Sequence, residues 1–356
     1  MEITETIRIQ KTTHSSLHDV DWNNLEFGKY NADHMLVCDF KNGEWQAAKI
    51  IPFANLSMSP VTLSLHYGQT IFEGMKAFKM TDSRTNIFRP EKHYERFVRS
   101  AERMCIEVVP KEVFIEGLHQ LVKLDVAWVP SQPGSALYIR PFIIATEARL
   151  GVKISEEYRF IIVSGPVGPL YQKPISVKVE RDFVRACKGG TGYAKCGGNY
   201  GAAFYPAKKA KEQGYDQVLW TDGKENKYIE ESGTMNVMFA IDDTLVTPPL
   251  SDSILEGITR DSFIVLAKEA GIAVEERPVS VDELKEAFRN KTIKEAFGVG
   301  TAAVASPIKM IGIDDVQYNL PTNSPTSVMN LLKSKLDNIR TGKKPDTHNW
   351  NYIVNF

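Results

Sequence analysis

One glycine-rich segment, residues 189–204, limits what this chain can fold into more than any other feature. It reads GGTGYAKCGGNYGAAF and places six glycines around a single lysine, Lys195. Glycine adopts positive φ and lets the backbone approach other groups closely, at an entropic cost that an ordinary surface loop has no reason to bear. Asn199 can cap a helix, and apolar residues follow it at helical spacing. We predict a loop that presents one amine, followed by a helix that fixes the loop in place.

Taken alone, this segment also fits a glycine-rich turn with a solvated lysine, because short motifs often arise by chance. A chemical role for Lys195 therefore needs support from the rest of the chain.

The charge balance excludes some classes of protein. The chain has 43 Lys and Arg against 44 Asp and Glu, which gives a net charge of −1. Proteins that bind nucleic acids or membrane surfaces carry a basic excess or a basic stripe, so we expect neither kind of partner. The length of 356 residues exceeds what one hydrophobic core usually supports, which predicts two domains.

Cysteine usage and hydropathy indicate the compartment. The four cysteines are scattered, with no CxxC pair and no Cys/His cluster at zinc spacing, so we expect reduced thiols and no bound metal. No apolar run reaches the ~18 residues that span a bilayer. The first ten residues, MEITETIRIQ, contain no apolar signal core. These features predict a cytoplasmic protein.

The order of the predicted elements favours an α+β fold. Runs rich in β-branched residues predict strands over 136–147 and 157–165, and residues 216–250 are typical of an antiparallel meander. Pro90 and Glu91 mark a helix N-terminus. Further helices are expected over 113–125, 259–270, 281–290 and 324–339. Because strands and helices lack a regular βαβ period, a mixed fold is favoured over a doubly wound sheet.

A change in composition predicts the domain boundary. The segment 166–178 begins with PVGPLYQKPI, which holds three prolines and a glycine. Such composition is typical of interdomain linkers. We therefore expect an N-terminal α/β domain over 1–165, a linker over 166–178 and a C-terminal domain with the lysine over 179–356.

Three short features could bind an anion. Residues 257–260, GITR, enter a predicted helix, whose free N–H groups favour a phosphate. Residues 298–302, GVGTA, form a glycine turn that ends in a hydroxyl. Arg96, on the helix that Pro90 opens, can supply a bidentate cation. Each feature also fits a plain structural role, as a helix cap, a bulge or a solvated helix face.

A pair of carboxylates, Glu230 and Glu231, lies between apolar strand-like runs. A carboxylate in apolar surroundings is either paired or acts on a bound group. We expect Glu230 to face water and Glu231 to face inward. The alternative is a hairpin edge at which both face water.

Together, these features meet the needs of pyridoxal phosphate. A lysine amine can condense with its aldehyde, N–H groups and an arginine can hold its phosphate, and a carboxylate can keep its ring nitrogen protonated.

Nine motifs, spread in order over most of the chain, carry a resemblance to a known family. They read FGKYNADHML, LHYGQTIFEGMKAF, FRPEKHYERFVRSAERMC, LYIRPFI, YAKCGGNYGA, QVLWTDG, ESGTMN, VTPPLSDSILEGITRDS and FGVGTAA. With them the chain resembles the branched-chain amino acid aminotransferases, class IV enzymes of fold type IV. The resemblance implies two domains, the second with an antiparallel-rich sheet or barrel.

The resemblance also implies how the cofactor is bound. Lys195 resembles the Schiff-base lysine, which also moves the proton between the substrate Cα and the cofactor. Tyr200 is similar to the tyrosine that hydrogen-bonds the ring oxygen, and Glu231 to the carboxylate that pairs with the pyridine nitrogen. The phosphate and the remaining cofactor contacts match Arg96, Ile258, Thr259, Thr301 and Thr234.

For the substrate, the resemblance implies that main-chain N–H groups of Thr301 and Ala302 bind the α-carboxylate. Arg140 resembles the arginine that pairs with the distal carboxylate of glutamate. The side-chain pocket matches Phe27, Tyr67, Phe72, Tyr138 and Thr234. Tyr67 and Val152 match positions that reach the site of a second subunit, so a homodimer is implied.

The implied activity is reversible, ping-pong transfer of the amino group between L-leucine, L-isoleucine or L-valine and 2-oxoglutarate. A D-amino acid aminotransferase or an aminodeoxychorismate lyase on the same scaffold is the nearest alternative. A nucleotide- or phosphometabolite-binding protein without covalent chemistry is another.

The chain departs from the family pattern at a few positions. Ala303 and Ser306 replace the CxxC of some animal enzymes, so no thiol switch is expected there. Met238 stands where an aromatic ring is preferred. A family tyrosine that contacts the site from the linker falls near Leu170 or Tyr171.

Overall fold

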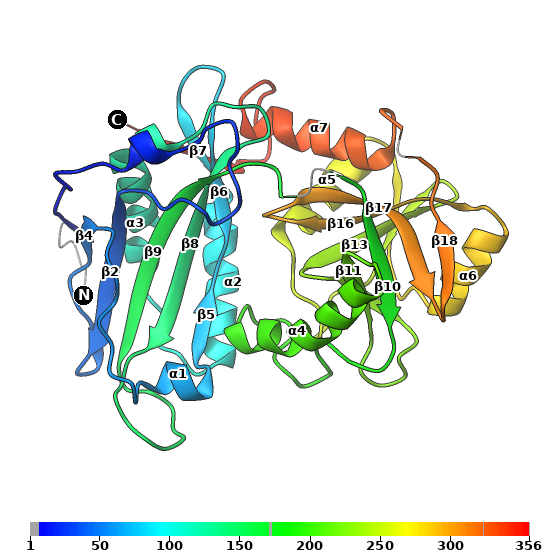
Figure 1. Cartoon of the computed structure of the whole chain (residues 1–356). Coiled ribbons are helices and arrows are strands. Elements are labelled where there is room, and N and C mark those ends of the chain that lie inside the picture. Colours follow the sequence, from blue (N-terminus) through cyan, green and yellow to red (C-terminus); the bar gives the residue numbers. More distant parts are fainter. Residues whose placement is uncertain (1–6, 171–172, 323, 356) are drawn as a thin grey trace. The chain divides into compact units, whose positions relative to one another are not determined.

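The computed structural model describes residues 7–170, 173–322 and 324–355, and Figure 1 traces their helices and strands. The contacts divide the chain into two compact units. Unit 1 holds the described residues of 1–170, 194–197 and 339–356, and unit 2 holds those of 171–193 and 198–338. The short piece of the glycine-rich segment that carries Lys195 therefore belongs to unit 1, whereas its flanks belong to unit 2.

Unit 1 is built on one large sheet. The strand order is β1-β4-β2-β9-β8-β6-β7-β19, with β3 beside β2 and β5 beside β8. The strands are β1 Arg8–Ile9, β2 His34–Lys41, β3 Glu44–Trp45, β4 Lys49–Pro52, β5 Thr70–Phe72, β6 Met75–Lys79, β7 Thr85–Phe88, β8 Ala136–Ala145, β9 Tyr158–Val167 and β19 Asn351–Val354.

Two long strands, β8 and β9, form the centre of this sheet (Figure 1). They pair antiparallel over their whole length, from Ala136 opposite Val167 to Ala145 opposite Tyr158. Along β8, buried and partly exposed residues alternate, as in a strand with one face on a core. The core face carries Leu137 and Ile139, and the other face carries Tyr138 and Arg140.

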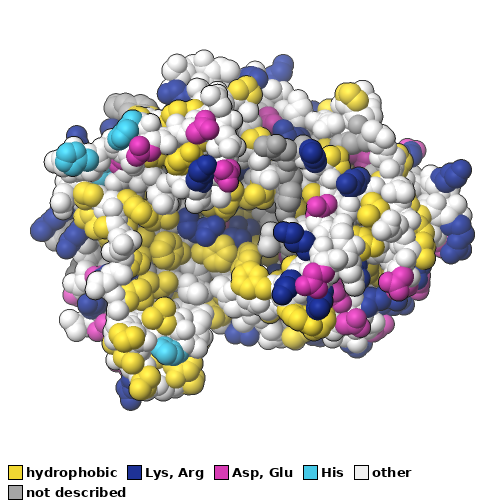
Figure 2. Space-filling model, viewed as in Figure 1, with side chains coloured by type: hydrophobic (Ala, Val, Ile, Leu, Met, Phe, Trp, Pro, Cys, Tyr) yellow, Lys and Arg dark blue, Asp and Glu magenta, His cyan; other side chains and the backbone are white. Residues whose placement is uncertain are grey.

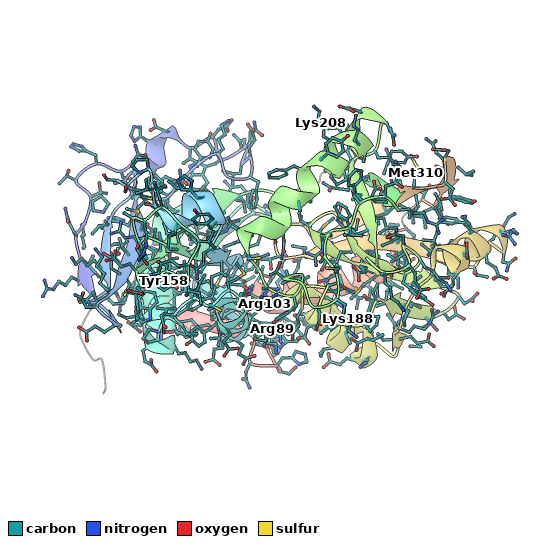
Figure 3. All side chains as sticks on the ribbon, turned by 90° about the horizontal axis from the view of Figure 1, so that it is seen from below. Arg89, Arg103, Tyr158, Lys188, Lys208 and Met310 are labelled. Carbon is teal, nitrogen blue, oxygen red and sulfur yellow. The ribbon has the colours of Figure 1, made fainter. Side chains whose placement is uncertain are left out.

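Two helices pack against the core face of the sheet, α2 (Pro90–Arg103) and α3 (Lys111–Leu124). Rings from both helices and from β9 meet there: Phe97, Phe114 and Phe160 have centroids 5.4 to 5.8 Å apart. Burying rings of this size stabilises the packing by about 1.5–3 kcal/mol each. Figure 3 labels Arg89 and Arg103, which mark the two ends of α2. The shorter helices are η1 Leu17–Asp19, α1 Leu63–Tyr67 and η2 Val126–Trp128.

The end of the chain returns to unit 1, because β19 pairs antiparallel with β7 and completes one edge of the sheet. Trp350 packs edge-on against Phe88 and under the guanidinium of Arg89. The sequence-based limits placed residues 339–356 and 194–197 in the second domain. The division into compact units places both pieces with unit 1. Apart from these two pieces, the domain limits of 1–165, 166–178 and 179–356 remain a prediction.

Unit 2 contains a sheet that closes on itself. Its strand order is β12-β11-β10-β17-β16-β13-β14-β15, and β12 also pairs with β13. The strands are β10 Ile175–Glu180, β11 Gln217–Thr221, β12 Ile229–Ser232, β13 Met235–Ile241, β14 Thr244–Thr247, β15 Ala273–Glu276, β16 Ile293–Gly300, β17 Val304–Ile313 and β18 Val316–Asn319. The helices are α4 Gly197–Glu212, α5 Ile258–Glu269, α6 Val281–Arg289 and α7 Val328–Arg340.

The α+β class, the barrel-like sheet and the antiparallel meander from β11 to β14 confirm the fold expected from the sequence. Two local predictions were wrong. Asn199 does not cap α4, which already begins at Gly197; its side chain bonds Thr191 instead, with Nδ2 2.8 Å from the carbonyl oxygen. Gly298 is not part of the expected glycine turn over 298–302, because it pairs with Val237 inside β16. Within the described residues, no helix is both long and apolar enough to cross a bilayer.

Candidate active site

In unit 1, two hydrogen bonds of its main chain hold Lys195 in place. Its N–H donates to Oγ of Ser100 on α2 at 2.9 Å, and its carbonyl accepts from the N–H of Phe72, at the end of β5, at 3.0 Å. Cys196 forms a bridge with Ile71. The segment 194–197 is therefore fixed between a strand and a helix. The side-chain amine lies over the ring of Phe72, 4.7 Å from its centroid.

Arg96 lies on α2, one turn before Ser100, in a buried ionic cluster. Its Nε and Nη2 donate to the two carboxylate oxygens of Glu73 at 2.7 and 2.8 Å. Nδ1 of His93 lies 2.6 Å from the same carboxylate. Burial alone would raise the pKa of Glu73, but Arg96 and His93 more than offset it and hold that pKa far below its ordinary value. Burial lowers the pKa of His93, and the carboxylate of Glu73 partly opposes this shift.

The outer face of β8 presents the residues expected to contact the substrate. Nη2 of Arg140 donates to the hydroxyl of Tyr138 at 3.0 Å, and its guanidinium lies over the ring of Phe72 at 4.8 Å. Phe27 packs edge-on against Tyr138, with centroids 4.8 Å apart. Phe27, Tyr138 and Arg140 line a cavity of about 190 Å³ in unit 1. An aromatic wall and one cation thus share this cavity.

Tyr67 and Val152 lie together on the surface of unit 1. The hydroxyl of Tyr67 accepts from the N–H of Gly151 at 3.2 Å, and Val152 is 82% exposed. Figure 2 shows hydrophobic side chains gathered at this end of unit 1, around α1 and the loop after β8. The most exposed of them are Leu65, Tyr67, Leu150, Val152 and Ile154.

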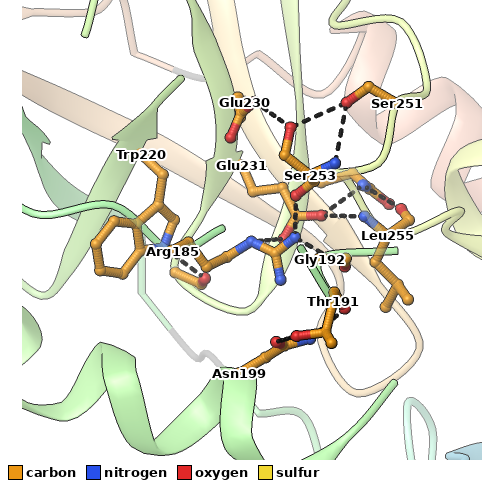
Figure 4. Close-up of polar contacts among 12 residues, drawn as sticks. Arg185, Thr191, Gly192, Asn199, Trp220, Glu230, Glu231, Ser251, Ser253 and Leu255 are labelled. Carbon is orange, nitrogen blue, oxygen red and sulfur yellow. Dashed lines mark hydrogen bonds and ion pairs between the residues drawn. The ribbon is translucent and has the colours of Figure 1, made fainter. Parts of the chain in front are cut away.

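In unit 2, Glu231 lies in β12 with a full set of partners (Figure 4). Its Oε1 accepts from the N–H of Leu255 at 2.7 Å, and its Oε2 pairs with Nε of Arg185 at 3.1 Å. Both side chains are more than nine-tenths buried. A nearby cation and a main-chain N–H favour the charged form of a carboxyl group.

The prediction that Glu230 faces water was wrong. Glu230 is 7% exposed, because both faces of β12 are covered. Oγ of Ser253 donates to its Oε1, while its Oε2 has no hydrogen-bond partner among the residues that the structure describes (Figure 4). Burial raises the pKa of Glu230 to about 7, which the bond from Ser253 and the charge of Arg185 only partly oppose.

Two candidate phosphate-binding segments of unit 2 have the expected backbone. Ile258 and Thr259 form the first turn of α5, with Gly257 at the N-cap. A Cβ on Gly257 would fall 1.8 Å from Oδ1 of Asn236, so only glycine fits there. Thr301 and Ala302 form the turn between β16 and β17. That turn ends at Val304 with φ of 63°, a rare conformation for a β-branched residue, and such strain is common at functional sites.

The remaining predicted residues also lie in unit 2. Tyr200 is half-buried in the first turns of α4, and Thr234 is exposed in the turn that joins β12 to β13. The structure thus groups Lys195, Phe72, Arg96, Tyr138, Arg140 and Phe27 within unit 1. The two carboxylates, the α5 turn and the Thr301 turn are grouped by chain and sheet within unit 2. Tyr171, one of the two expected positions of the linker tyrosine, lies outside the described residues.

Sequence reasoning missed three residues that hold the others in place: Glu73, Ser100 and Arg185. The signal for Glu73 was present, since a lone acid follows the apolar run TIF in one of the nine motifs. Ser100 and Arg185 carry no such signal, because a serine on a helix and an arginine after a strand are common on protein surfaces.

Comparison with known proteins assigns the class. Residues 70–311 match the family model for amino-transferase class IV. This match covers more than half of the chain, so the chain belongs to the class IV aminotransferases.

Individual relatives narrow the family. The branched-chain-amino-acid aminotransferase 2 of Bacillus subtilis is 44% identical over 97% of this chain and 96% of its own length. The branched-chain-amino-acid aminotransferase of Mycolicibacterium smegmatis is 44% identical over 92% of this chain and 91% of its own. Within its class, the chain therefore belongs to the branched-chain-amino-acid aminotransferase family.

A solved structure agrees with this placement. The Escherichia coli branched-chain amino acid aminotransferase matches with a TM-score of 0.73 at 27% identity, over 89% of this chain and 99% of that one.

Proposed function

We propose that this protein transfers the amino group reversibly between L-leucine, L-isoleucine or L-valine and 2-oxoglutarate, with pyridoxal phosphate as its cofactor. The observation that carries the proposal is the position of Lys195. Its backbone is bonded to Phe72 and to Ser100, one turn of α2 from the buried guanidinium of Arg96. A lysine whose backbone is fixed near a buried arginine suits a cofactor that carries an aldehyde and a phosphate.

The residues present fit this cofactor. A buried arginine and the N-terminal turn of α5, where Gly257 leaves no room for a Cβ, suit a phosphate dianion. Glu231, paired with Arg185, suits a protonated pyridine nitrogen. When bound, pyridoxal phosphate supplies an electron sink for the bond that breaks at the substrate α-carbon.

We propose the following roles for the chain's own residues. Lys195 takes the proton from the α-carbon of the amino acid in the first half-reaction. In the second half-reaction it returns a proton to the α-carbon of the new amino acid. Arg96, Ile258, Thr259 and Thr301 hold the phosphate, Tyr200 and Thr234 contact the ring side of the cofactor, and Glu231 holds the proton on the ring nitrogen.

The cavity beside β8 supports the dual substrate specificity. Phe27 and Tyr138 offer aromatic surface there to a branched aliphatic side chain, and the ring of Phe72 lies against Arg140. Arg140, stacked on Phe72 and bonded to Tyr138, offers a cation to the distal carboxylate of glutamate. We propose that main-chain N–H groups of Thr301 and Ala302 bind the α-carboxylate that both substrates share.

We further propose a homodimer, in which the hydrophobic surface around Tyr67 and Val152 is covered by the second subunit. Exposed apolar patches of this kind mark interaction sites. Sedimentation equilibrium should then give twice the chain mass of 40.0 kDa, and a monomer mass would refute it. The four free cysteines suit a cytoplasmic location, which cell fractionation checks.

The substitution Lys195→Ala tests the proposal. Purified wild-type protein should show a visible cofactor band and should turn over L-leucine with 2-oxoglutarate. The variant should lose the band and nearly all turnover, because no other amine takes the role of Lys195.

Lys188→Ala is the matched control for Lys195→Ala, since Lys188 is an exposed lysine just before the same loop (Figure 3). It should keep both band and turnover. Turnover that survives in Lys195→Ala would refute the role of Lys195. Wild-type turnover with D-alanine, and none with L-leucine, would favour a D-amino acid aminotransferase.

A further inference from the structure

Glu73 is a buried charged group that no proposed step of the reaction uses. It is fully buried in the short connection between β5 and β6. An ionised carboxylate at such a position costs several kcal/mol unless it is paired and hydrogen-bonded. Its retention in the core of unit 1 therefore needs a reason.

The partners of Glu73 point to that reason. Oε1 accepts from Nε of Arg96 at 2.7 Å, and Oε2 accepts from Nη2 of Arg96 at 2.8 Å, so the two groups form a bidentate pair. Nδ1 of His93, one turn earlier on α2, lies 2.6 Å from Oε2. A bidentate pair fixes both the plane and the direction of a guanidinium.

The main chain fixes the carboxylate in turn. The N–H of Glu73 donates to the carbonyl of Pro141 on β8 at 2.7 Å, and the N–H of Gly74 donates to Oε2 at 3.2 Å. Through Glu73, the orientation of Arg96 is thus fixed relative to β8, the central strand, as well as to its own helix.

Glu73 occupies only some of the N–H donors of Arg96. A guanidinium has five N–H donors, and Glu73 takes two of them along one edge. The other three donors lie off this edge. An arginine without this clamp would lose rotamer order and would have to be reordered on each binding event.

We propose that Glu73, with His93, is a positioning residue that holds Arg96 ready for the phosphate of the cofactor. The inference rests on the proposed function, because it takes Arg96 as a phosphate ligand. Glu73 itself touches neither the cofactor nor the substrate in this account. Its effect is on phosphate affinity, not on the chemistry of Lys195.

The test compares two ligands that differ only in the phosphate. Apoprotein of the wild type and of E73Q is titrated with pyridoxal phosphate and with pyridoxal, and binding is followed by the visible band. In E73Q, one acceptor oxygen of the clamp is replaced by an NH₂ that faces donors. Affinity for pyridoxal phosphate should fall on the order of tenfold to a hundredfold, while affinity for pyridoxal stays within about twofold.

Two further variants make the comparison specific. Glu91→Gln removes an exposed charge from the first turn of the same helix and should leave both affinities unchanged. In an Arg96→Ala background, adding E73Q should cause no further loss of phosphate-dependent affinity, because the residue through which Glu73 acts is gone.

Each outcome decides the proposal. An equal loss of affinity for both ligands, or no loss for either, would overturn it, as would an undiminished effect in the Arg96→Ala background. If E73Q does not yield folded protein, E73D is used, which keeps the charge but retracts it by one methylene and should show the same selective loss. A wild-type protein that binds neither ligand would refute the proposed function instead.

Discussion

At the scale of the residue, the environment decides which buried carboxylates stay charged. Glu73 is paired with Arg96 and contacts His93, and Glu231 is paired with Arg185. Glu230 receives one hydroxyl bond, and within the described part of the chain no cation pairs with it. Burial favours the neutral form of an acid, and only a close cation or several donors reverse that preference. Two neighbouring glutamates of one strand thus lie in different electrostatic surroundings.

The raised pKa of Glu230 predicts a pH-dependent stability. Its carboxyl shifts from a pKa of 4.5 when unfolded to about 7 when folded. A raised pKa means that the stabilising neutral form is fully present below pH 4.5 and is lost as the pH rises through 7. At 1.36 kcal/mol per unit, the wild type should lose about 3 kcal/mol at most over this range from Glu230.

Glu230→Gln checks this prediction, since it keeps the shape of the side chain and removes the titration. Urea unfolding of the apoproteins should give similar stabilities at pH 5, and the variant should be the more stable of the two at pH 8.5. A difference that is equal at both pH values would contradict a raised pKa.

At the scale of the element, α2 connects the proposed phosphate-binding arginine, Arg96, with the proposed cofactor lysine, Lys195. Arg96 and Ser100 lie one turn apart, and Oγ of Ser100 donates to the carbonyl of Arg96 while it accepts from the N–H of Lys195. One helix therefore sets the spacing between the buried cation and the backbone of the lysine. The rings of Phe97 and Phe114 lock this helix onto the sheet.

Ser100→Ala should weaken this connection. It leaves the N–H of Lys195 without its acceptor in a buried place, which costs about 1–3 kcal/mol. Urea unfolding of the apoprotein measures this loss, and the exposed serine in Ser57→Ala provides the control. A Ser100→Ala variant as stable as Ser57→Ala would show that the bond contributes nothing.

Elements with a strong local signal could be predicted from the sequence. Pro90 at the start of α2, the alternation along β8 and the meander from β11 to β14 all follow from neighbouring residues. What could not be predicted depends on contacts between distant residues. The burial of Glu230 requires both faces of β12 to be covered, and the role of Asn199 depends on Thr191 across a turn.

The candidate site divides along the same line. Lys195, Arg96 and Glu231 were found because a motif or an unusual charge marks them in the chain. Glu73, Ser100 and Arg185 contact these residues, and such contacts become visible only when distances are known.

At the scale of the whole molecule, chain order and compact units do not coincide. Residues 194–197 and the described residues of 339–356 belong with the described residues of 1–170. Each return is made by backbone pairing: Ile71 with Cys196, and β7 with β19. A linker assigned from composition cannot detect such returns, because pairing of this kind depends on long-range contacts.

The central claim is that Lys195 is the residue to which pyridoxal phosphate is attached. Reduction of the holoenzyme with borohydride, followed by tryptic digestion and mass spectrometry, tests it directly. The account predicts a phosphopyridoxyl group on Lys195, within an uncleaved peptide that begins after Lys188. A label on another lysine, with Lys195 unmodified and cleaved normally, would contradict it.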